Sequence, residues 1–136
     1  KHFEAPNLLV DLENLKRKVD TGASYIVTQM FFDNSKFFRF TEECRKIGIA
    51  VPIIAGIKPI SALNDINLLP QTFHIDMPHD LVLALQKCKT DKDAREVGIE
   101  WAVMQSKELI RAGVPGIHYY TLGRSDNVAR IVKEAF

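Results

Sequence analysis

The chain has almost no excess charge and no long apolar run. Its 18 Lys and Arg residues are balanced by 17 Asp and Glu residues, which gives a net charge of +1 over 136 residues. This balance offers no electrostatic case for binding nucleic acid or an anionic membrane. No apolar stretch approaches the roughly 20 residues of a membrane-spanning helix, and the first residues lack the pattern of a signal peptide. We therefore expect a globular protein that binds neither nucleic acid nor membrane.

Cysteine is also scarce, since the chain contains only Cys44 and Cys88. Neither has a second Cys or a His at the spacing of a zinc site, so we expect no metal. Two isolated thiols in helical patterns are typical of a reducing compartment, which predicts a cytoplasmic location. No Ser-His-Asp or Cys-His set, no Gly-rich phosphate loop and no acid–base pair of carboxylates stands out. Spacing alone therefore assigns no catalytic residue.

The chain does show a regular alternation of amphipathic helices and short β-branched runs. Apolar stripes predict helices over residues 7–20, 35–46, 61–69, 79–87, 91–112 and from 125 or 126 onward. Strands are predicted over 24–28, 51–57 and 117–122, with the second apolar enough to be covered on both faces. Residues 71–77 are expected to be loop or marginally extended. This order predicts an α/β fold with a parallel sheet, and three strands with bare edges suggest part of a larger barrel or sheet.

All three predicted strands end in residues suited to ligands, at Gln29, at 56–59 and at 121–124. In a parallel sheet these ends lie at one edge, where α/β folds bind ligands. Gln29 offers donors and an acceptor to a heterocycle, although on position alone a hydrogen bond to local backbone is the favoured interpretation. Arg124 is suited to a carboxylate, with an ordinary surface Arg as an equal alternative. His118, Trp101 and Met104 are predicted to be core residues.

The first predicted helix carries a second, polar stripe beside its apolar one. Asp11, Asn14 and Lys18 are three and four residues apart, and Arg17 borders them. A solvated, charge-balanced face is the usual meaning of such a stripe. A phosphate-bearing ligand is the alternative, and composition does not choose between them.

Several longer sequence blocks follow one another through nearly the whole chain. They are His2-x-Glu4-Ala5, Asp11-Leu12-x-Asn14-Leu15-Lys16-x-Lys18-Val19, Gly22-Ala23, Thr28-Gln29-x-Phe31-Phe32-Asp33, Pro52-Ile53-x-Ala55-Gly56-Ile57-x-Pro59 and Val114-Pro115-Gly116-x-His118-x-Tyr120-Thr121-Leu122-x-Arg124. Taken together, these blocks resemble the methylenetetrahydrofolate reductase family.

The resemblance implies parallel (β/α) units that form part of a (β/α)8 TIM barrel. In that family FAD lies at the carboxyl ends of the strands, and methylenetetrahydrofolate is reduced to methyltetrahydrofolate with electrons from NAD(P)H, in one-carbon metabolism and methionine biosynthesis. Residues 1–136 then correspond to the carboxy-terminal half of the catalytic barrel. The family's acid Glu is expected upstream, so no catalytic residue is predicted in this segment, which we expect to be inactive alone and part of a homo-oligomer at full length.

The resemblance also implies site residues. FAD contacts are predicted for His2, Ala5, Asp11, Asn14, Arg17 and Lys18. Substrate contacts are predicted for Gln29, which would meet the pterin and the nicotinamide in turn, for Arg124 near the glutamate tail, and for Leu69 against the aromatic linker. Asp65 stands where some members have a substrate-binding Gln.

Two other functions remain open from the sequence. One is a non-catalytic half-barrel module that pairs with another chain, favoured by the missing acid and the bare sheet edges. The other is a different barrel enzyme that acts on phosphate-bearing substrates, which would need a phosphate-binding loop near Gly113 to Gly123.

Overall fold

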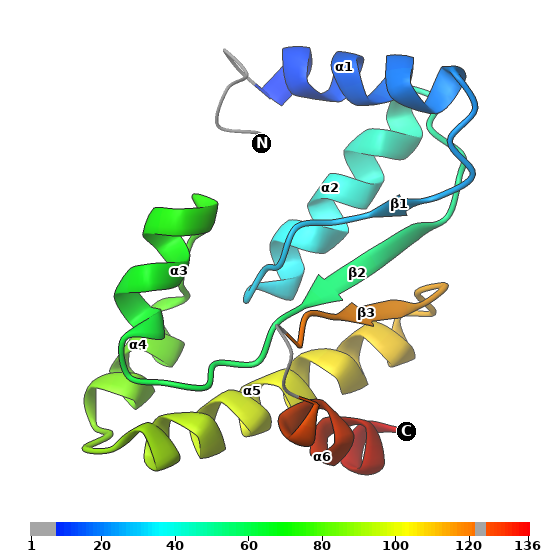
Figure 1. Cartoon of the computed structure of the whole chain (residues 1–136). Helices are drawn as coiled ribbons and strands as arrows, with labels where there is room; N and C mark the ends of the chain where they lie inside the picture. The colour runs from blue at the N-terminus through cyan, green and yellow to red at the C-terminus, as the bar shows by residue number, and fades with distance from the viewer. Residues whose placement is uncertain (1–7, 122–124) are drawn as a thin grey trace.

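The computed structural model describes residues 8–121 and 125–136 and contains the predicted alternation of elements (Figure 1). The elements in order are α1 (Leu8–Asp20), β1 (Ile26–Val27), α2 (Asn34–Lys46), β2 (Ile53–Ile57), α3 (Asp65–Phe73), α4 (His79–Gln86), α5 (Asp91–Arg111), β3 (Ile117–Tyr119) and α6 (Asp126–Ala135). This order matches the prediction element by element. None of the helices within these described ranges has the length and apolar character needed to cross a bilayer.

The three strands form one sheet in the order β1-β2-β3, and both strand pairs are parallel. Ile26 aligns with Ile53, and Gly56 aligns with His118. The regular strands are shorter than predicted, with two, five and three residues. Backbone hydrogen bonds nevertheless continue past them, because Thr28 N donates to Ile54 O and Tyr120 N to Ile57 O. The predicted α/β fold with a parallel sheet is therefore confirmed.

The main core lies between one face of the sheet and helices α2 and α5. Ile53, Ala55 and Ile57 of β2 are buried there with Phe37 of α2 and Leu109 of α5. Strand side chains alternate between faces, so the neighbouring positions Val27, Ile54 and His118 point to the other face. Val27 is 38% exposed and His118 is exposed. On β2 itself, Ile54 is half-buried and Gly56 is buried, so this strand has little exposed surface on either face, and the open part of this sheet face lies on β1 and β3.

A second core lies beyond the carboxyl ends of the strands. Helices α3 and α4 bury Leu69, Leu81 and Leu85 against Ile60 and the first turn of α5. Figure 1 shows this pair of helices (green) standing apart from α1 and α2, past the tip of β2. This second core therefore builds a wall at the end of the sheet where α/β proteins bind ligands.

Helix α3 begins later and ends later than predicted. The predicted helix began at residue 61, but α3 starts at Asp65. The Asp65 carboxylate accepts hydrogen bonds from Ser61 N and Ala62 N and holds the preceding residues as a turn. The helix continues through Pro70 to Phe73, so the expected loop over 71–77 is partly helical. His74, with a left-handed φ of 53°, then ends it.

Two other side-chain predictions are wrong and one is confirmed. Met104 is 51% exposed, because its part of α5 faces away from the sheet, and His118 lies on the uncovered face instead of in the core. Trp101 is partly buried and donates to Phe32 O at 2.9 Å.

Both cysteines are free thiols, and burial raises the pKa of the Cys44 thiol to about 11.

Candidate functional site

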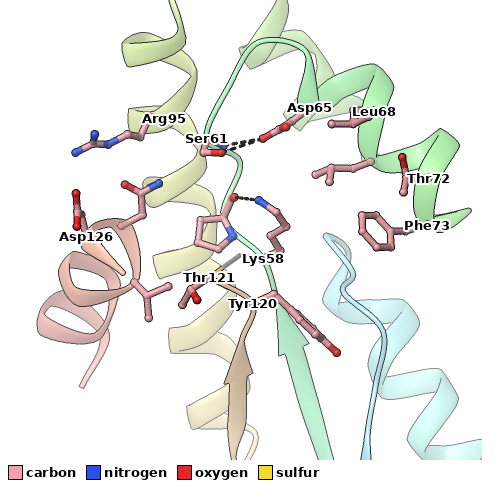
Figure 2. A pocket seen from close by; sticks show the side chains of 14 residues that line it. Lys58, Ser61, Asp65, Leu68, Thr72, Phe73, Arg95, Tyr120, Thr121 and Asp126 are labelled. Atoms are coloured by element: carbon pink, nitrogen blue, oxygen red, sulfur yellow. Dashed lines mark hydrogen bonds between the residues drawn. The ribbon is translucent and has the colours of Figure 1, made fainter. Parts of the chain in front are cut away.

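A cavity of about 390 Å³ lies at the carboxyl ends of β2 and β3. Figure 2 shows Lys58 and Tyr120 at the two strand ends, with Phe73 of α3 on one side and Arg95 of α5 on the other. Asp126, at the start of α6, closes the side near Arg95. The volume is within the range of small-molecule sites.

The strand ends beside the cavity are held together by close contacts around Gly56. Gly56 N donates to Thr28 Oγ1 at 3.0 Å, and the Tyr120 hydroxyl donates to Thr28 O at 2.8 Å. A Cβ atom at Gly56 would overlap the Thr28 carbonyl oxygen and lie 2.9 Å from the Tyr120 ring. Glycine is therefore required where the Tyr120 side chain crosses β2 to reach Thr28. Tyr119 instead shares a hydrogen bond with Ser106 of α5, so the two tyrosines point to opposite faces of the sheet.

Lys58 is the buried cation of the cavity, with 6% of its surface exposed. Its Nζ donates to Pro59 O at 3.1 Å, and among the described residues it forms no ion pair. Burial lowers the pKa of the Lys58 ammonium, and the nearby Asp65 carboxylate partly opposes that shift. The site therefore contains a positive charge that is only partly compensated.

Asp65 is the buried anion of the cavity and has a structural role in the loop that follows β2. Its Oδ2 atom accepts from Ser61 N at 2.8 Å, from Ala62 N at 3.2 Å and from the Ser61 hydroxyl at 3.4 Å. A carboxylate in this arrangement fixes the backbone that leads from Lys58 into α3. Ser61 and Asp65 appear with these bonds dashed in Figure 2.

A buried polar network fixes the loop that leads from β1 to α2. Asn34 Nδ2 donates to Gln105 O at 3.1 Å, and Gln105 Nε2 donates to Phe31 O at 3.1 Å and to Asn34 Oδ1 at 3.0 Å. These bonds tie the residues after Gln29 to the middle of α5. The end of β1 is thus held against the same helix that carries Arg95.

Comparison with known proteins identifies the family. The family model described as methylenetetrahydrofolate reductase matches residues 1–135. The chain belongs to this family. A probable methylenetetrahydrofolate reductase (NADPH) of Caenorhabditis elegans is 36% identical over 97% of this chain, and the 5,10-methylenetetrahydrofolate reductase of Salmonella typhimurium is 38% identical over 92% of it. The chain spans 20% of the first relative and 43% of the second.

A solved structure has the same fold at lower sequence similarity. It is described as an uncharacterized protein from Clostridium thermocellum that binds two copies of 5-methyl-5,6,7,8-tetrahydrofolic acid. The match covers 94% of this chain and 47% of that chain, with a TM-score of 0.58 and 15% identity. Six helices around a parallel sheet, in a reductase-family chain, are consistent with part of a TIM barrel.

Two predicted substrate residues of this reductase-family chain, Leu69 and Gln29, lie within the described residues. Leu69 lines the cavity and is 2% exposed. Gln29 follows β1 but does not line the cavity, and its Oε1 accepts from Met30 N at 3.0 Å, which is the local-backbone alternative that position favoured. Arg124 lies outside the described residues, between Thr121 and Asp126, which both line the cavity.

The predicted FAD residues form a separate group on α1. Asn14, Arg17 and Lys18 are exposed, and Asp11 is half-buried. Arg17 Nη1 donates to Asn14 Oδ1 at 3.3 Å. None of these side chains lines the cavity beside Lys58, and His2 and Ala5 lie outside the described residues. The structure therefore presents two polar groups, one exposed on a helix and one enclosed at the strand ends.

Sequence reasoning missed two cavity cations, Lys58 and Arg95. Arg95 Nε is buried without a hydrogen-bond partner among the residues that the structure describes. Nothing in the pattern of α5 marks Arg95. Lys58 did carry a signal, because it is a lone charge directly after the buried run Ile53–Ile57 and at the predicted ligand edge.

Proposed function

We propose that this chain forms the carboxy-terminal half of the catalytic (β/α)8 barrel of an FAD-dependent enzyme that reduces methylenetetrahydrofolate to methyltetrahydrofolate with NAD(P)H. The observation that carries the proposal is the family match over residues 1–135, joined to a cavity at the carboxyl ends of parallel strands. Active sites of (β/α)8 barrels lie at that edge. The names of the relatives and the folate ligand of the structural neighbour support the same substrate class.

The outer face of α1 fits a diphosphate-bearing cofactor. Arg17 and Lys18 are exposed cations on its last turn, and Lys16, directly before them, is instead paired with Asp20 at 2.6 Å. Guanidinium and ammonium groups offset phosphate charge, while Asp11 and Asn14 offer hydrogen bonds to hydroxyl groups. With His2 and Ala5, these residues would hold FAD. When bound, FAD supplies the hydride transfer between the nicotinamide and the folate.

The strand-end residues are proposed to bind the substrates. Leu69 would contact the aromatic linker of the folate, and Arg124 would bind its glutamate. Gln29 would have to release Met30 N to present its amide to the pterin or the nicotinamide. That exchange leaves Met30 N without its acceptor, so the new contact with the substrate has to outweigh a cost of about 1–3 kcal/mol. The proton donor is assigned to the other half of the barrel, and no residue of this chain is given that role.

The direct test uses the purified full-length protein that contains this chain. Retained flavin absorbance and methylenetetrahydrofolate-dependent oxidation of NAD(P)H are expected. A full-length protein that retains no flavin and shows no such oxidation would refute the proposal. The purified segment alone is expected to be inactive, and turnover by that segment would contradict the assignment of the acid to the other half.

Gln29 offers a narrower test in the same enzyme. Replacing Gln29 by Glu removes the amide donor and adds charge, so the folate half-reaction is expected to slow at least about tenfold, the value of one or two charged hydrogen bonds. Gln86→Glu is the matched control, because Gln86 is an exposed residue at the end of α4 that does not line the cavity. Stopped-flow reoxidation of the reduced flavin by folate measures the step. Equal rates for the two variants would reject the role of Gln29.

A second function is favoured by the uncovered sheet face that holds Val27 and His118. A non-catalytic half-barrel would use this face to pair with another chain. Mass measurement and flavin absorbance of the purified chain separate the two functions. A stable, flavin-free monomer that remains inactive after mixing with the other half of the barrel would favour the non-catalytic module.

A further inference from the structure

Lys58 occupies a position where a charge is costly. It follows β2 directly, where strand alternation turns Ile57 toward the helices and Lys58 toward the cavity. Its surface is 6% exposed, so the ammonium has lost most of its contact with water. A desolvated charge destabilises the folded protein unless partners replace that water.

The partners in the structure are too few for this charge. An ammonium group has three N–H donors, and Lys58 Nζ has one hydrogen bond, to the Pro59 carbonyl oxygen at 3.1 Å. The Asp65 charge partly offsets this desolvation, but the Asp65 carboxylate is bound to Ser61 and Ala62 and makes no ion pair with Lys58. Among the residues that the structure describes, two donors of Lys58 therefore remain for a ligand.

The surroundings of Lys58 are suited to a ligand that joins a flat ring to an anionic group. Figure 2 shows the Lys58 side chain between Pro59, whose carbonyl oxygen accepts from the ammonium, and the Phe73 ring of α3, with Asp65 above. Leu69 and Phe73 supply apolar surface for a ring. The ammonium lies beside that surface and would meet a negatively charged substituent.

We propose that Lys58 is a substrate-binding residue whose ammonium donates to an anionic oxygen of the molecule in this cavity. The proposal builds on the reductase function proposed above, which offers two sources of such an oxygen. One is a carboxylate of the folate glutamate, and the other is the diphosphate of the nicotinamide nucleotide. A resident ligand that supplies the missing acceptors accounts for a buried lysine that the fold itself does not need.

The test compares Lys58→Met with the unaltered full-length enzyme. Methionine keeps the length and the apolar stem of lysine but removes the charge and the donors. Dissociation constants are measured for 5-methyltetrahydrofolate, for the same folate with both glutamate carboxylates converted to neutral amides, and for the nicotinamide nucleotide. Lys107→Met is the control, because Lys107 is an exposed lysine of α5 that does not line the cavity.

The expected result is a loss of affinity of about tenfold to a hundredfold for one ligand, the range for hydrogen bonds to a charged group. If the glutamate is the partner, the difference between Lys58→Met and the unaltered enzyme disappears for the diamide folate. If the diphosphate is the partner, only nicotinamide nucleotide binding weakens. Lys107→Met is expected to bind all three ligands normally.

Thermal unfolding of the ligand-free proteins separates binding from structure. Because Lys58→Met removes a buried charge, it is expected to melt at the same temperature as the unaltered enzyme or above it, while it binds more weakly. A lower melting temperature with unchanged affinities would overturn the proposal in favour of a structural lysine. Failure of the unaltered enzyme to bind folate or nucleotide would overturn the reductase function as well, whereas unchanged affinity in Lys58→Met overturns the role of Lys58 alone.

Discussion

The enclosed polar residues at the strand ends and the exposed polar residues on α1 carry similar charges in opposite settings. Lys58 and Asp65 are both 6% exposed. Arg17 and Lys18 are on an outer helix face and are exposed. Because Lys58 and Asp65 are buried, each of their charges has a large effect on the stability of the folded protein. The charges on α1 are solvated and change that stability little. A charge on α1 can therefore be kept for a ligand at almost no structural cost.

The largest expected effect comes from crowding the strand ends. Gly56→Ala is expected to destabilise the protein by about 3 kcal/mol, because the new Cβ overlaps the Thr28 carbonyl oxygen and crowds the Tyr120 ring. Chemical denaturation of both proteins measures the loss. Gly116→Ala is the matched control, since its Cβ would meet only Ile54 side-chain atoms at 3.9 Å, and it should change stability by less than about 0.5 kcal/mol. Equal losses would contradict the close approach at Gly56.

Removal of the buried carboxylate is expected to have the next largest effect. Asp65→Ala leaves Ser61 N and Ala62 N without their acceptor, which should cost about 2 kcal/mol of stability. Asp76→Ala provides the contrast, because the Asp76 side chain is 82% exposed and forms one surface pair with Lys36. That change should cost less than about 0.5 kcal/mol. Urea denaturation compares them, and a mild Asp65→Ala phenotype would mean that the loop holds without this cap.

Lys58→Met is expected to act in the opposite direction and to depend on pH. Burial lowers the pKa of Lys58 below its usual 10.5, with Asp65 partly opposing the shift, so the unfolded chain holds the proton more strongly than the folded one. The penalty is fully present below the folded pKa and fades as the pH rises toward 10.5. Lys58→Met should therefore gain about 1 kcal/mol near pH 7, and the difference in melting temperature should narrow at alkaline pH. A difference that stays constant with pH would contradict this origin.

The smallest effect on stability is expected on α1. Replacing Arg17 and Lys18 together by Ala should change the free energy of unfolding by less than about 0.5 kcal/mol, since both side chains are exposed. The same change should weaken flavin retention at least about tenfold, if these cations offset a diphosphate. Lys16→Ala on the same helix breaks only the pair with Asp20 and should keep the flavin. Flavin absorbance after gel filtration is the measurement, and full retention by the double variant would remove α1 from the cofactor site.

The order of elements was predictable because helical stripes and β-branched runs alternate without ambiguity. The lengths of the strands were less predictable. A regular strand ends where it stops pairing with its neighbour, and this pairing cannot be seen in the sequence of one strand alone. Met104 and His118 were misplaced for a related reason. Periodicity identifies an apolar or mixed face, but which face another element covers is decided by tertiary packing.

The candidate site was predictable in location and only partly in detail. Parallel strands bring their carboxyl ends to one edge, so the region around residues 56–59 was found from the order of the elements alone, whereas Leu69 was predicted only from the family resemblance. The start of α3 was missed because Ser61 has a good capping side chain, while the buried Asp65 carboxylate four residues later captured the backbone donors instead. Lys58 was missed although it is a lone charge directly after a buried run, because its burial and its shortage of hydrogen-bond partners are visible only in the folded structure.

The hydrogen bond between the Tyr120 hydroxyl and the Thr28 carbonyl oxygen connects β3 to β1 across the middle strand β2. It links the segment that leads to Arg124 with the peptide directly before Gln29. If binding of a folate tail moved the chain after β3, Tyr120 would either move Thr28 with it, or its hydroxyl would lose the Thr28 carbonyl oxygen as acceptor. Binding of the glutamate tail near Arg124 would thus shift the backbone at Gln29, the residue proposed to contact the pterin.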